Sequence, residues 1–313
     1  MKAVQMNEYG GAEVVMVVEN ADKPSIQPGQ VLVEVYAAGV NPFDWKVREG
    51  MVRQMAELKF PGAILGGDLA GVVAEVGTEV ANVQVGDEVY GLAGALSSHG
   101  SFAQFAPAAA GSIGVKPKNV DFTTAAALPL AGVSAYQALV ETLHLTSGQK
   151  ILIHGGAGGI GSIAIQLAKH LGATVATTVS VAGAGYVKGL GADVVIDYEK
   201  QSFKDELSDY DAVFDTIGGE VYAQSFEVLK EGGSIVSMSA AVDEALASAH
   251  KVTAYSQFTQ ATTERLAELT KLVESGAIKV NVDRVFSLDE ADVALEYVKT
   301  GRPIGKVVIK VRD

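Results

Sequence analysis

The stretch ILIHGGAGGIGSIAIQLAK, residues 151–169, limits the possible folds of this chain more than any other segment. It opens with an apolar run, continues with five glycines among residues 155–161, and then repeats apolar residues at helical spacing. This pattern predicts a buried strand, a tight turn and a helix. A second apolar run, Thr174–Val179, follows the helix and completes a βαβ unit.

The glycine spacing in this turn is typical of a phosphate-binding loop. Gly156, Gly158 and Gly161 form a G-x-G-x-x-G pattern in the strand–turn–helix context that a dinucleotide fingerprint requires. In such loops the glycines permit the turn, let the backbone approach the pyrophosphate, and let the helix pack on the strand. Gly159 and Ile160 complete the predicted cofactor-binding loop, whose helix start attracts an anion. A glycine-rich turn without a ligand is the alternative, and the βαβ context favours the dinucleotide.

The end of the second strand bears on which dinucleotide binds. NAD-binding units carry an acidic residue about 20 residues after the first glycine, and no acid lies between Gly172 and Gly191. Ser180 stands where a hydroxyl can accept a 2′-phosphate, so NADPH is favoured over NADH. This loop carries no Arg or Lys before Lys188, which we interpret as a solvated helix residue.

Composition excludes several classes of function. The length of 313 residues is compatible with two domains. A formal net charge of −13 argues against a nucleic-acid partner or an acidic membrane surface. No apolar run reaches the length of a membrane span, and the start, MKAVQMNEYGG, lacks the apolar segment of a signal peptide. Cysteine is absent, which excludes disulfides and thiolate metal sites. This is consistent with a reducing cytosol without requiring one, and we expect a cytoplasmic protein.

The order of predicted elements changes near residue 123. Residues 1–122 are predicted to be rich in strands, whereas strands and helices alternate afterwards, with Pro129 as a break in the first helical stretch. That alternation predicts an α/β fold with a doubly wound parallel sheet in residues 123–255. Residues 256–313 are assigned with residues 1–122 to the other domain, because the final strand, KVVIKV, is expected to return to it.

Six segments together resemble the medium-chain dehydrogenase/reductase superfamily, in its zinc-free NADPH quinone oxidoreductase and alkenal/enone reductase branch. They are AAGVNPFDWKVREG, LGGDLAGVVAEVG, VGDEVYG, LPLAGVSAYQAL, HGGAGGIGSIAIQLAK and GKVVI. The resemblance implies a GroES-like β-rich catalytic domain plus a Rossmann dinucleotide-binding domain, with the active site in the cleft between them. It also implies a homodimer that reduces small-molecule quinones or enones with NADPH.

The residues at the metal site of zinc-dependent relatives bear on the chemistry. Zinc alcohol dehydrogenases place a ligand Cys where this chain has Asn41, a ligand His where it has Gly67, and a Glu where it has Asp68. The resemblance therefore implies no metal. Hydride addition to a plain ketone makes a localised alkoxide that zinc normally stabilises. Quinones and α,β-unsaturated carbonyls spread this charge, so that hydrogen-bond donors can stabilise it.

Asn41 and Lys46 are the candidate catalytic residues. The resemblance places Asn41 in the stretch facing the nicotinamide, where its amide can donate to the substrate oxygen or hold the nicotinamide ribose. A turn residue before Pro42 is the alternative. Lys46 can supply positive charge or a proton to the enolate, or it can form a surface ion pair with Asp44. Family members often have Tyr at this position, so solvent or a ribose hydroxyl remains an alternative proton donor.

The resemblance implies further cofactor-binding residues. Ser134 matches a position that contacts the nicotinamide ring or ribose, with a helix Ser bonded to its own backbone as the alternative. Tyr198 matches a Tyr that helps to hold the 2′-phosphate, although the partner Lys of the family corresponds to Gly183 here. Ser237 and Ser239 end a later strand near the nicotinamide, where backbone groups of the family bind the carboxamide, with ordinary strand termini as the alternative.

A second class of function stays open. Some members of this branch bind NADPH and serve structural or regulatory roles with little turnover, as lens crystallins do. Steady NADPH consumption with an electrophilic acceptor distinguishes an enzyme from such a protein. The missing ligands disfavour a third class, a zinc alcohol dehydrogenase.

Overall fold

The computed structural model describes residues 1–55, 58–94 and 96–312. The chain divides into two compact units. Unit 1 comprises Met1–Leu130, Ala261–Glu274 and Val280–Asp313, and unit 2 comprises Ala131–Gln260 and Ser275–Lys279. Within the described residues, each helix is either too short or too polar to cross a lipid bilayer.

Unit 1 consists mainly of strands, as predicted for residues 1–122. Its strands are β1 (Ala3–Met6), β2 (Val15–Val18), β3 (Gln30–Val40), β4 (Ala63–Ile64), β5 (Asp68–Val76), β6 (Glu88–Leu92), β7 (Phe105–Ala109), β8 (Ile113–Val115), β15 (Val282–Ser287) and β16 (Lys306–Lys310). Its helices are α1 (Pro42–Arg48), α2 (Phe122–Ala126), α9 (Thr263–Glu274) and α10 (Ala291–Lys299), with 3₁₀ turns at η1 (Ala12–Val14), η2 (Ala110–Ser112) and η6 (Leu288–Glu290). Helix α1 follows Asn41 directly and was not predicted.

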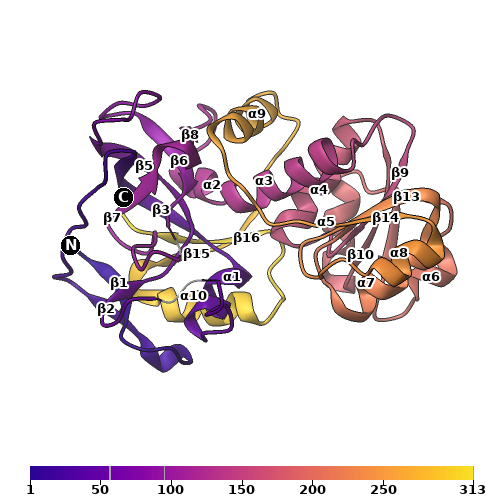
Figure 1. Ribbon diagram of the computed structural model, residues 1–313, viewed down its shortest axis with the longest axis horizontal. Helices are drawn as coiled ribbons and strands as arrows, with labels where there is room; N and C mark the ends of the chain where they lie inside the picture. Colours follow the sequence, from indigo (N-terminus) through magenta and orange to yellow (C-terminus); the bar gives the residue numbers. More distant parts are fainter. Residues whose placement is uncertain (56–57, 95, 313) are drawn as a thin grey trace. The chain divides into compact units, whose positions relative to one another are not determined.

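The large sheet of unit 1 is organised around β3. The described strands follow the order β15-β16-β3-β5-β6-β8, and β7 pairs with the first half of β3. Strand β16 runs antiparallel to the second half of β3, which confirms that the final strand returns to this unit. Helices α1 and α10 lie side by side against it (Figure 1).

Strand β3 is buried along nearly its whole length because apolar groups cover both of its faces. Val31 and Val33 belong to one apolar cluster of the sheet interior. Ala38 and Val40 belong to a second cluster, together with side chains of α10 and β16. The end of β3, where Asn41 follows, is therefore anchored in the second cluster.

Unit 2 alternates strands and helices. Its strands are β9 (Lys150–His154), β10 (Thr174–Val179), β11 (Val194–Asp197), β12 (Tyr210–Asp215), β13 (Leu229–Ser237) and β14 (Thr253–Ser256). Its helices are α4 (Gly159–His170), α5 (Ala184–Gly189), α6 (Phe203–Glu206), α7 (Gly219–Ser225) and α8 (Glu244–His250), with shorter turns at η4 (Val181–Gly183) and η5 (Phe226–Val228). Helix α3 (Pro129–Tyr136) leads into the unit through a π-helical segment, η3 (Gln137–Thr142). The predicted break at Pro129 is confirmed, because α2 ends at Ala126 and α3 begins at that proline.

The sheet of unit 2 is parallel and doubly wound, as predicted. The described strands lie in the order β11-β10-β9-β12-β13-β14, which is 3-2-1-4-5-6 in chain order. This is the order of dinucleotide-binding sheets, which bind their ligand where the order reverses, at the carboxyl ends of the first and fourth strands. Helices α4 and α5 cover one face, and α7 and α8 cover the other (Figure 1). The reversal falls between β9 and β12, so the glycine loop after β9 lies at this point.

Candidate functional site

The predicted dinucleotide loop connects β9 to α4. Gly155 has a φ of +69°, a conformation that favours glycine, and it turns the chain out of the strand. The Gly158 N–H then donates to the Gly155 carbonyl at 3.0 Å, which closes the turn before α4 begins. The sequence prediction of strand, glycine turn and helix is confirmed here to within two residues.

Each fingerprint glycine meets different surroundings. A Cβ atom on Gly156 would overlap the Thr177 hydroxyl of β10, and one on Gly161 would lie 2.8 Å from the Gly156 Cα. These two glycines therefore allow the loop and the helix to pack on the sheet. A Cβ on Gly158 would meet no atom closer than the Gly155 carbonyl oxygen, at 3.4 Å. The space beside Gly158 is open, as a loop that receives a pyrophosphate requires.

The start of α4 supplies donors to that open space. The first amide groups of a helix, here those of Gly159 and Ile160, have no carbonyl partner within the helix. The helix dipole adds partial positive charge at the same end. The residues present thus fit a dinucleotide phosphate.

A buried histidine, His154, ends β9 and directly precedes the loop. His154 is fully buried, with its Nδ1 atom 3.0 Å from the Thr178 hydroxyl and its Nε2 atom 2.9 Å from the Ser225 hydroxyl. Burial lowers the pKa of His154 to about 4, and the nearby Asp215 carboxylate opposes this only partly. The neutral ring joins β9, β10 and α7 beneath the loop.

Ser180 and Tyr198 follow neighbouring strands. Val179 pairs with Asp197 in the β10–β11 ladder, so the register places the two predicted residues next to each other. Ser180 is half-buried and Tyr198 is exposed. At Gly183, a Cβ would lie 2.6 Å from side-chain atoms of Ala157 and Val179, which leaves no room for the Lys of the family at this position.

Three predicted serines have neighbours that the sequence did not indicate. The Ser237 hydroxyl donates to the Asp215 carboxylate at 2.6 Å and accepts the Ser239 N–H at 3.1 Å. It therefore shapes the loop after β13. Ser239 is exposed, and its hydroxyl donates to a backbone carbonyl at 3.2 Å. Ser134 is buried in α3, with its hydroxyl 2.7 Å from that of Thr259.

In unit 1, strand register brings three polar side chains to the end of β3. Val307 pairs with Val40, which places Lys306 beside Asn41. On the other side of β3, Gly39 pairs with the first residue of β5, Asp68. Asn41, Asp68 and Lys306 are 3%, 0% and 5% exposed, and we call these three side chains the Asn41 cluster.

The Asn41 cluster is a closed ring of hydrogen bonds. The Lys306 ammonium donates to the Asn41 Oδ1 atom and, at 3.2 Å, to the Asp68 Oδ2 atom. The Asn41 Nδ2 atom donates to the same Asp68 oxygen at 3.0 Å. The other Asp68 oxygen accepts the Leu130 N–H at 2.9 Å. An ammonium thus lies between the residues found at two of the metal-site positions of zinc-dependent relatives.

Asn41 also begins helix α1. Its backbone N–H donates to the Asp44 carboxyl at 2.7 Å in a capping box, and Pro42 takes the first helical position. Asp44 is buried, and this burial raises the pKa of its carboxyl to about 7. Asp44 and Lys46 form no ion pair, so that alternative is wrong. The Lys46 ammonium instead lies 5.7 Å from the centre of the Trp45 ring.

Lys306 and the bonding of Asp68 are what sequence reasoning missed. Both residues lie in segments that carried the family resemblance, but no role was predicted for Lys306. The one available signal is a lysine directly before the apolar run of residues 307–309 in KVVIKV. Over the described residues, no group of three or more His, Asp or Glu side chains is placed to hold a metal ion.

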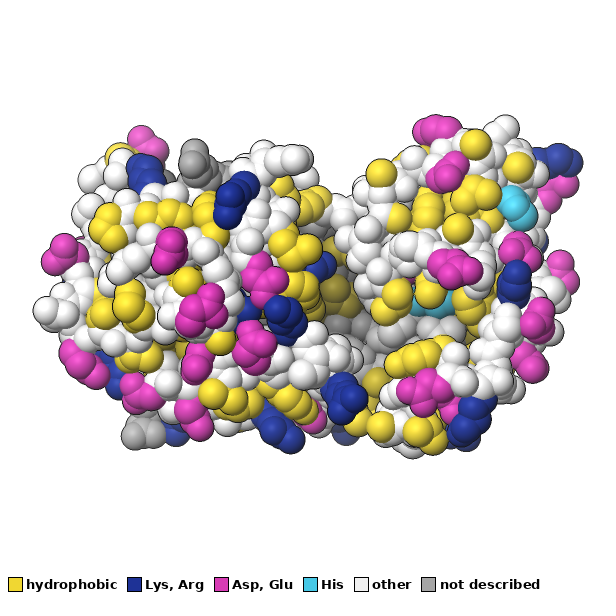
Figure 2. Space-filling model, turned by 90° about the horizontal axis from the view of Figure 1, so that it is seen from below, with side chains coloured by type: hydrophobic (Ala, Val, Ile, Leu, Met, Phe, Trp, Pro, Cys, Tyr) yellow, Lys and Arg dark blue, Asp and Glu magenta, His cyan; other side chains and the backbone are white. Residues whose placement is uncertain are grey.

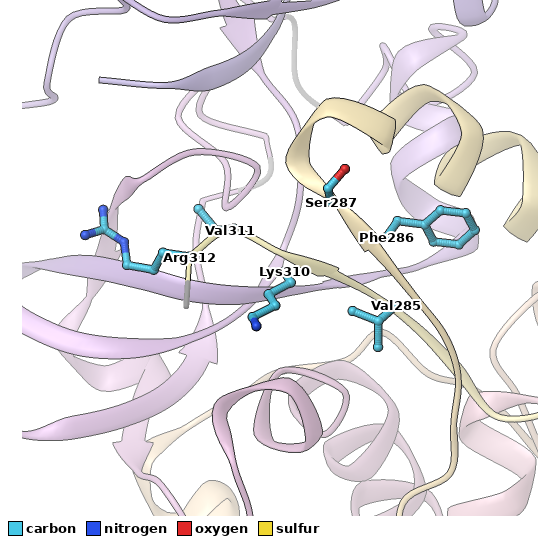
Figure 3. Close-up of a pocket in the computed structure, with 6 residues that line it drawn as sticks. All are labelled: Val285, Phe286, Ser287, Lys310, Val311 and Arg312. Atoms are coloured by element: carbon cyan, nitrogen blue, oxygen red, sulfur yellow. The ribbon is translucent and has the colours of Figure 1, made fainter.

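A surface pocket of about 320 Å³ lies elsewhere in unit 1, between the ends of β15 and β16. It is lined by Val285, Phe286 and Ser287 from the end of β15 and by Lys310, Val311 and Arg312 from the end of β16 and beyond (Figure 3). None of the predicted site residues lines this pocket.

Comparison with protein families gives two matches. Residues 27–119 match the alcohol dehydrogenase GroES-like domain, and residues 190–309 match the zinc-binding dehydrogenase family. The tomato (Solanum lycopersicum) 2-methylene-furan-3-one reductase is 40% identical over 319 residues, covering 99% of this chain and 79% of that protein. The Arabidopsis thaliana chloroplastic NADPH-dependent alkenal/one oxidoreductase is 37% identical, with the same coverage.

Solved structures of quinone oxidoreductases also resemble this chain. The quinone oxidoreductase from Coxiella burnetii superposes with a TM-score of 0.92 and 37% identity, over 100% of this chain and 99% of that one. The Escherichia coli quinone oxidoreductase complexed with NADPH superposes with a TM-score of 0.88 and 26% identity, over 99% and 100% of the two chains.

Proposed function

Because the chain belongs to the medium-chain dehydrogenase/reductase superfamily, in the branch of quinone and alkenal oxidoreductases, we propose that it is an NADPH-dependent reductase. Its acceptors are quinones or the activated double bond of α,β-unsaturated carbonyl compounds. Residues 123–255 form the proposed dinucleotide-binding domain, and residues 1–122 and 256–313 form the proposed GroES-like catalytic domain.

NADPH supplies the hydride when it is bound. The loop of Gly156, Gly158, Gly159, Ile160 and Gly161 holds its pyrophosphate, as the open space beside Gly158 supports. The loop glycines and the amide groups at the start of α4 bind the pyrophosphate through the backbone alone, and NADPH and NADH share this group. Other residues must therefore distinguish NADPH from NADH.

We assign cofactor selection to the ends of β10 and β11. Ser180 and Tyr198 take the 2′-phosphate, and the lack of an acid after β10 removes the repulsion that this phosphate would meet. Ser134, Ser237 and Ser239 remain proposed nicotinamide-side residues. The bonds of Ser237 to Asp215 support a role in shaping the loop whose backbone binds the ring.

Reduction without zinc is the part of the proposal that decides the substrate class. The observation that carries it is the identity of the residues at positions 41, 67 and 68, namely Asn, Gly and Asp. Catalytic zinc requires three protein ligands, and this set supplies neither a thiolate nor an imidazole. The acceptor must therefore delocalise the charge that it receives, as quinones and enones do.

Asn41 is the proposed donor to the acceptor oxygen. One N–H of its amide is bonded to Asp68, and its orientation is fixed by the ring of hydrogen bonds in the Asn41 cluster. A second N–H remains on the same nitrogen. Lys46 is the proposed source of positive charge or of the proton, with solvent as the competing donor.

The surface supports a small-molecule acceptor. The face in Figure 2 shows acidic and basic side chains interspersed, and the net charge of −13 disfavours nucleic acid and anionic membranes.

We propose a cytoplasmic protein that forms a homodimer. Strand β14 ends the described sheet of unit 2 with Tyr255 exposed, which supports dimerisation through this edge. Analytical ultracentrifugation tests this, and a monomer would refute it.

One assay tests the enzymatic proposal. NADPH and NADH oxidation are followed with benzoquinone, naphthoquinone, a simple enal and a cyclic enone, and the products are analysed for the carbon that received hydride. We expect turnover with NADPH and hydride at the β-carbon of the enones. Tight NADPH binding with no turnover would instead establish a structural or regulatory protein. Zinc-dependent oxidation of an unactivated secondary alcohol would refute reduction without zinc.

A further inference from the structure

We infer that Lys306 is a positioning residue of this reductase: its buried ammonium fixes the Asn41 amide in one orientation and strengthens the amide N–H offered to the acceptor oxygen. The inference rests on the proposed function, because it explains how Asn41 can act there as a donor.

The hydrogen-bond ring allows only one orientation of the amide. An ammonium group can only donate, and an ionised carboxylate can only accept. The Asn41 oxygen therefore has to face Lys306, and its nitrogen has to face Asp68, as observed. A flipped amide would set N–H groups against the ammonium and oxygen against the carboxylate.

Neighbouring backbone holds the ring in place. Asp68 cannot rotate without losing the bond from the Leu130 N–H at 2.9 Å, and the Asn41 N–H is bonded to Asp44 at 2.7 Å. All three side chains of the Asn41 cluster are more than nine-tenths buried. A site restrained in this way requires little reorganisation when charge develops on a bound acceptor.

The positive charge of Lys306 acts on the amide through its oxygen. A cation bonded to the carbonyl oxygen of an amide draws electron density from the nitrogen, which makes the N–H a stronger donor. Because the cluster is shielded from water, this electrostatic effect is weakly screened. Lys306 thus supplies fixed positive charge near the proposed donor without binding the acceptor itself.

The charges around the ammonium leave this effect intact. Asp68 from β5 is the anion bonded to Lys306, and Asp44 from α1 faces the same group. Burial keeps the Asp44 carboxyl largely protonated below pH 7. At pH values below this pKa, the cluster pairs one cation with one anion, so a second carboxylate does not cancel the positive charge.

The test compares four variants in steady-state assays with saturating NADPH. They are Asn41→Ala, Lys306→Met, Lys306→Arg and the double variant Asn41→Ala/Lys306→Met. The matched control is Lys310→Met, the same substitution at an exposed position of the same strand. NADPH affinity, measured by fluorescence titration, and the thermal unfolding midpoint show whether each protein is folded and binds cofactor.

We expect Lys306→Met to lower kcat roughly 10- to 100-fold, because it weakens a donor whose complete removal costs about 100-fold or more. NADPH affinity should stay unchanged, Lys306→Arg should retain more activity than Lys306→Met, and Lys310→Met should behave like the wild type. The double variant should be no slower than Asn41→Ala alone, since Lys306 acts through Asn41. The loss should be larger for an enone than for a quinone, because the enolate oxygen is the more basic.

Two results would overturn the inference. One is a wild-type kcat in Lys306→Met, and the other is a double variant whose loss is the product of the two single losses. If Asn41→Ala alone has no effect, the proposed role of Asn41 fails instead. If Lys306→Met does not fold, Asp68→Asn/Lys306→Met removes the buried anion with its cation. The kcat of this double variant must then be lower than that of Asp68→Asn alone, and equal kcat values would also refute the inference.

Discussion

Gly39 and Asp68 lie opposite each other in the β3–β5 ladder, and the Asp68 carboxylate fills the space that a side chain at residue 39 would need. A Cβ on Gly39 would lie 2.8 Å from the Asp68 Oδ2 atom, and it would also overlap the Ala126 carbonyl oxygen. The absence of a side chain in mid-strand is thus a requirement of the Asn41 cluster.

Gly39→Ala should destabilise the protein and slow the reaction. The added methyl group must displace Asp68 or the backbone of α2, at a cost of about 1–3 kcal/mol in the free energy of unfolding. Urea unfolding and kcat measure the two effects. Gly185→Ala in α5 is the control, because its Cβ would meet no atom within 4 Å. A Gly39→Ala protein as stable and active as the wild type would contradict the steric requirement.

Substitutions in the glycine loop should separate folding from cofactor binding. Gly158→Ala should leave the unfolding midpoint near that of the wild type but weaken NADPH binding, because the methyl group occupies the open space proposed for the pyrophosphate. Gly161→Ala should lower the midpoint itself, since its Cβ would overlap the Gly155 carbonyl. Differential scanning fluorimetry and NADPH titration measure both. Unchanged NADPH affinity in Gly158→Ala would argue against pyrophosphate binding there.

Ser180→Asp should reverse the cofactor preference. A carboxylate at the end of β10 would repel the 2′-phosphate, and charges about 5 Å apart near a protein surface are enough for a loss of roughly tenfold or more in NADPH affinity. NADH should be affected much less, because it carries no such phosphate. The ratio of kcat/KM for the two cofactors measures this, with Ser180→Asn as the uncharged control. An unchanged ratio would show that the 2′-phosphate binds elsewhere.

Asp44→Asn should change the pH dependence of stability. The Asp44 pKa is about 7 in the folded protein against an ordinary 3.8, so the folded state holds the proton while the unfolded state releases it. This stabilising contribution is present below pH 3.8 and is lost as pH rises to 7, by on the order of 4 kcal/mol. Asn keeps an oxygen for the Asn41 N–H but does not titrate. Its stability relative to the wild type should therefore rise between pH 4 and 7, and parallel urea profiles would contradict this.

The βαβ unit of the nucleotide-binding sheet could be predicted because its signals are local. The run Ile151–Ile153, the glycines and the following helix lie within one short stretch, and β10 was predicted at its observed bounds. The Asn41 cluster depends instead on strand register. Lys306 is 265 positions from Asn41 along the chain, and nothing in either segment specifies that β16 pairs with β3.

The hydrogen-bond partners of the predicted serines could not be predicted either, because they also depend on which strands are neighbours. Ser237 ends its strand as expected, but its bond to Asp215 depends on β12 and β13 being neighbours. Asp44 looked like half of a surface ion pair with Lys46. Burial and the capping box at Asn41 gave it a different environment, which side-chain charge alone does not reveal.

The pairing of Asn41 with Lys306 also sets an order of events during synthesis. A ribosome adding roughly 5–20 residues per second needs about 13–53 seconds to travel from one residue to the other. Until Lys306 has been made, Asp68 lacks its cation and half of β3 has an open edge. Unit 2, whose strands β9–β14 all precede Lys306 in the chain, can fold first, whereas the large sheet of unit 1 is completed only after β16 has been made.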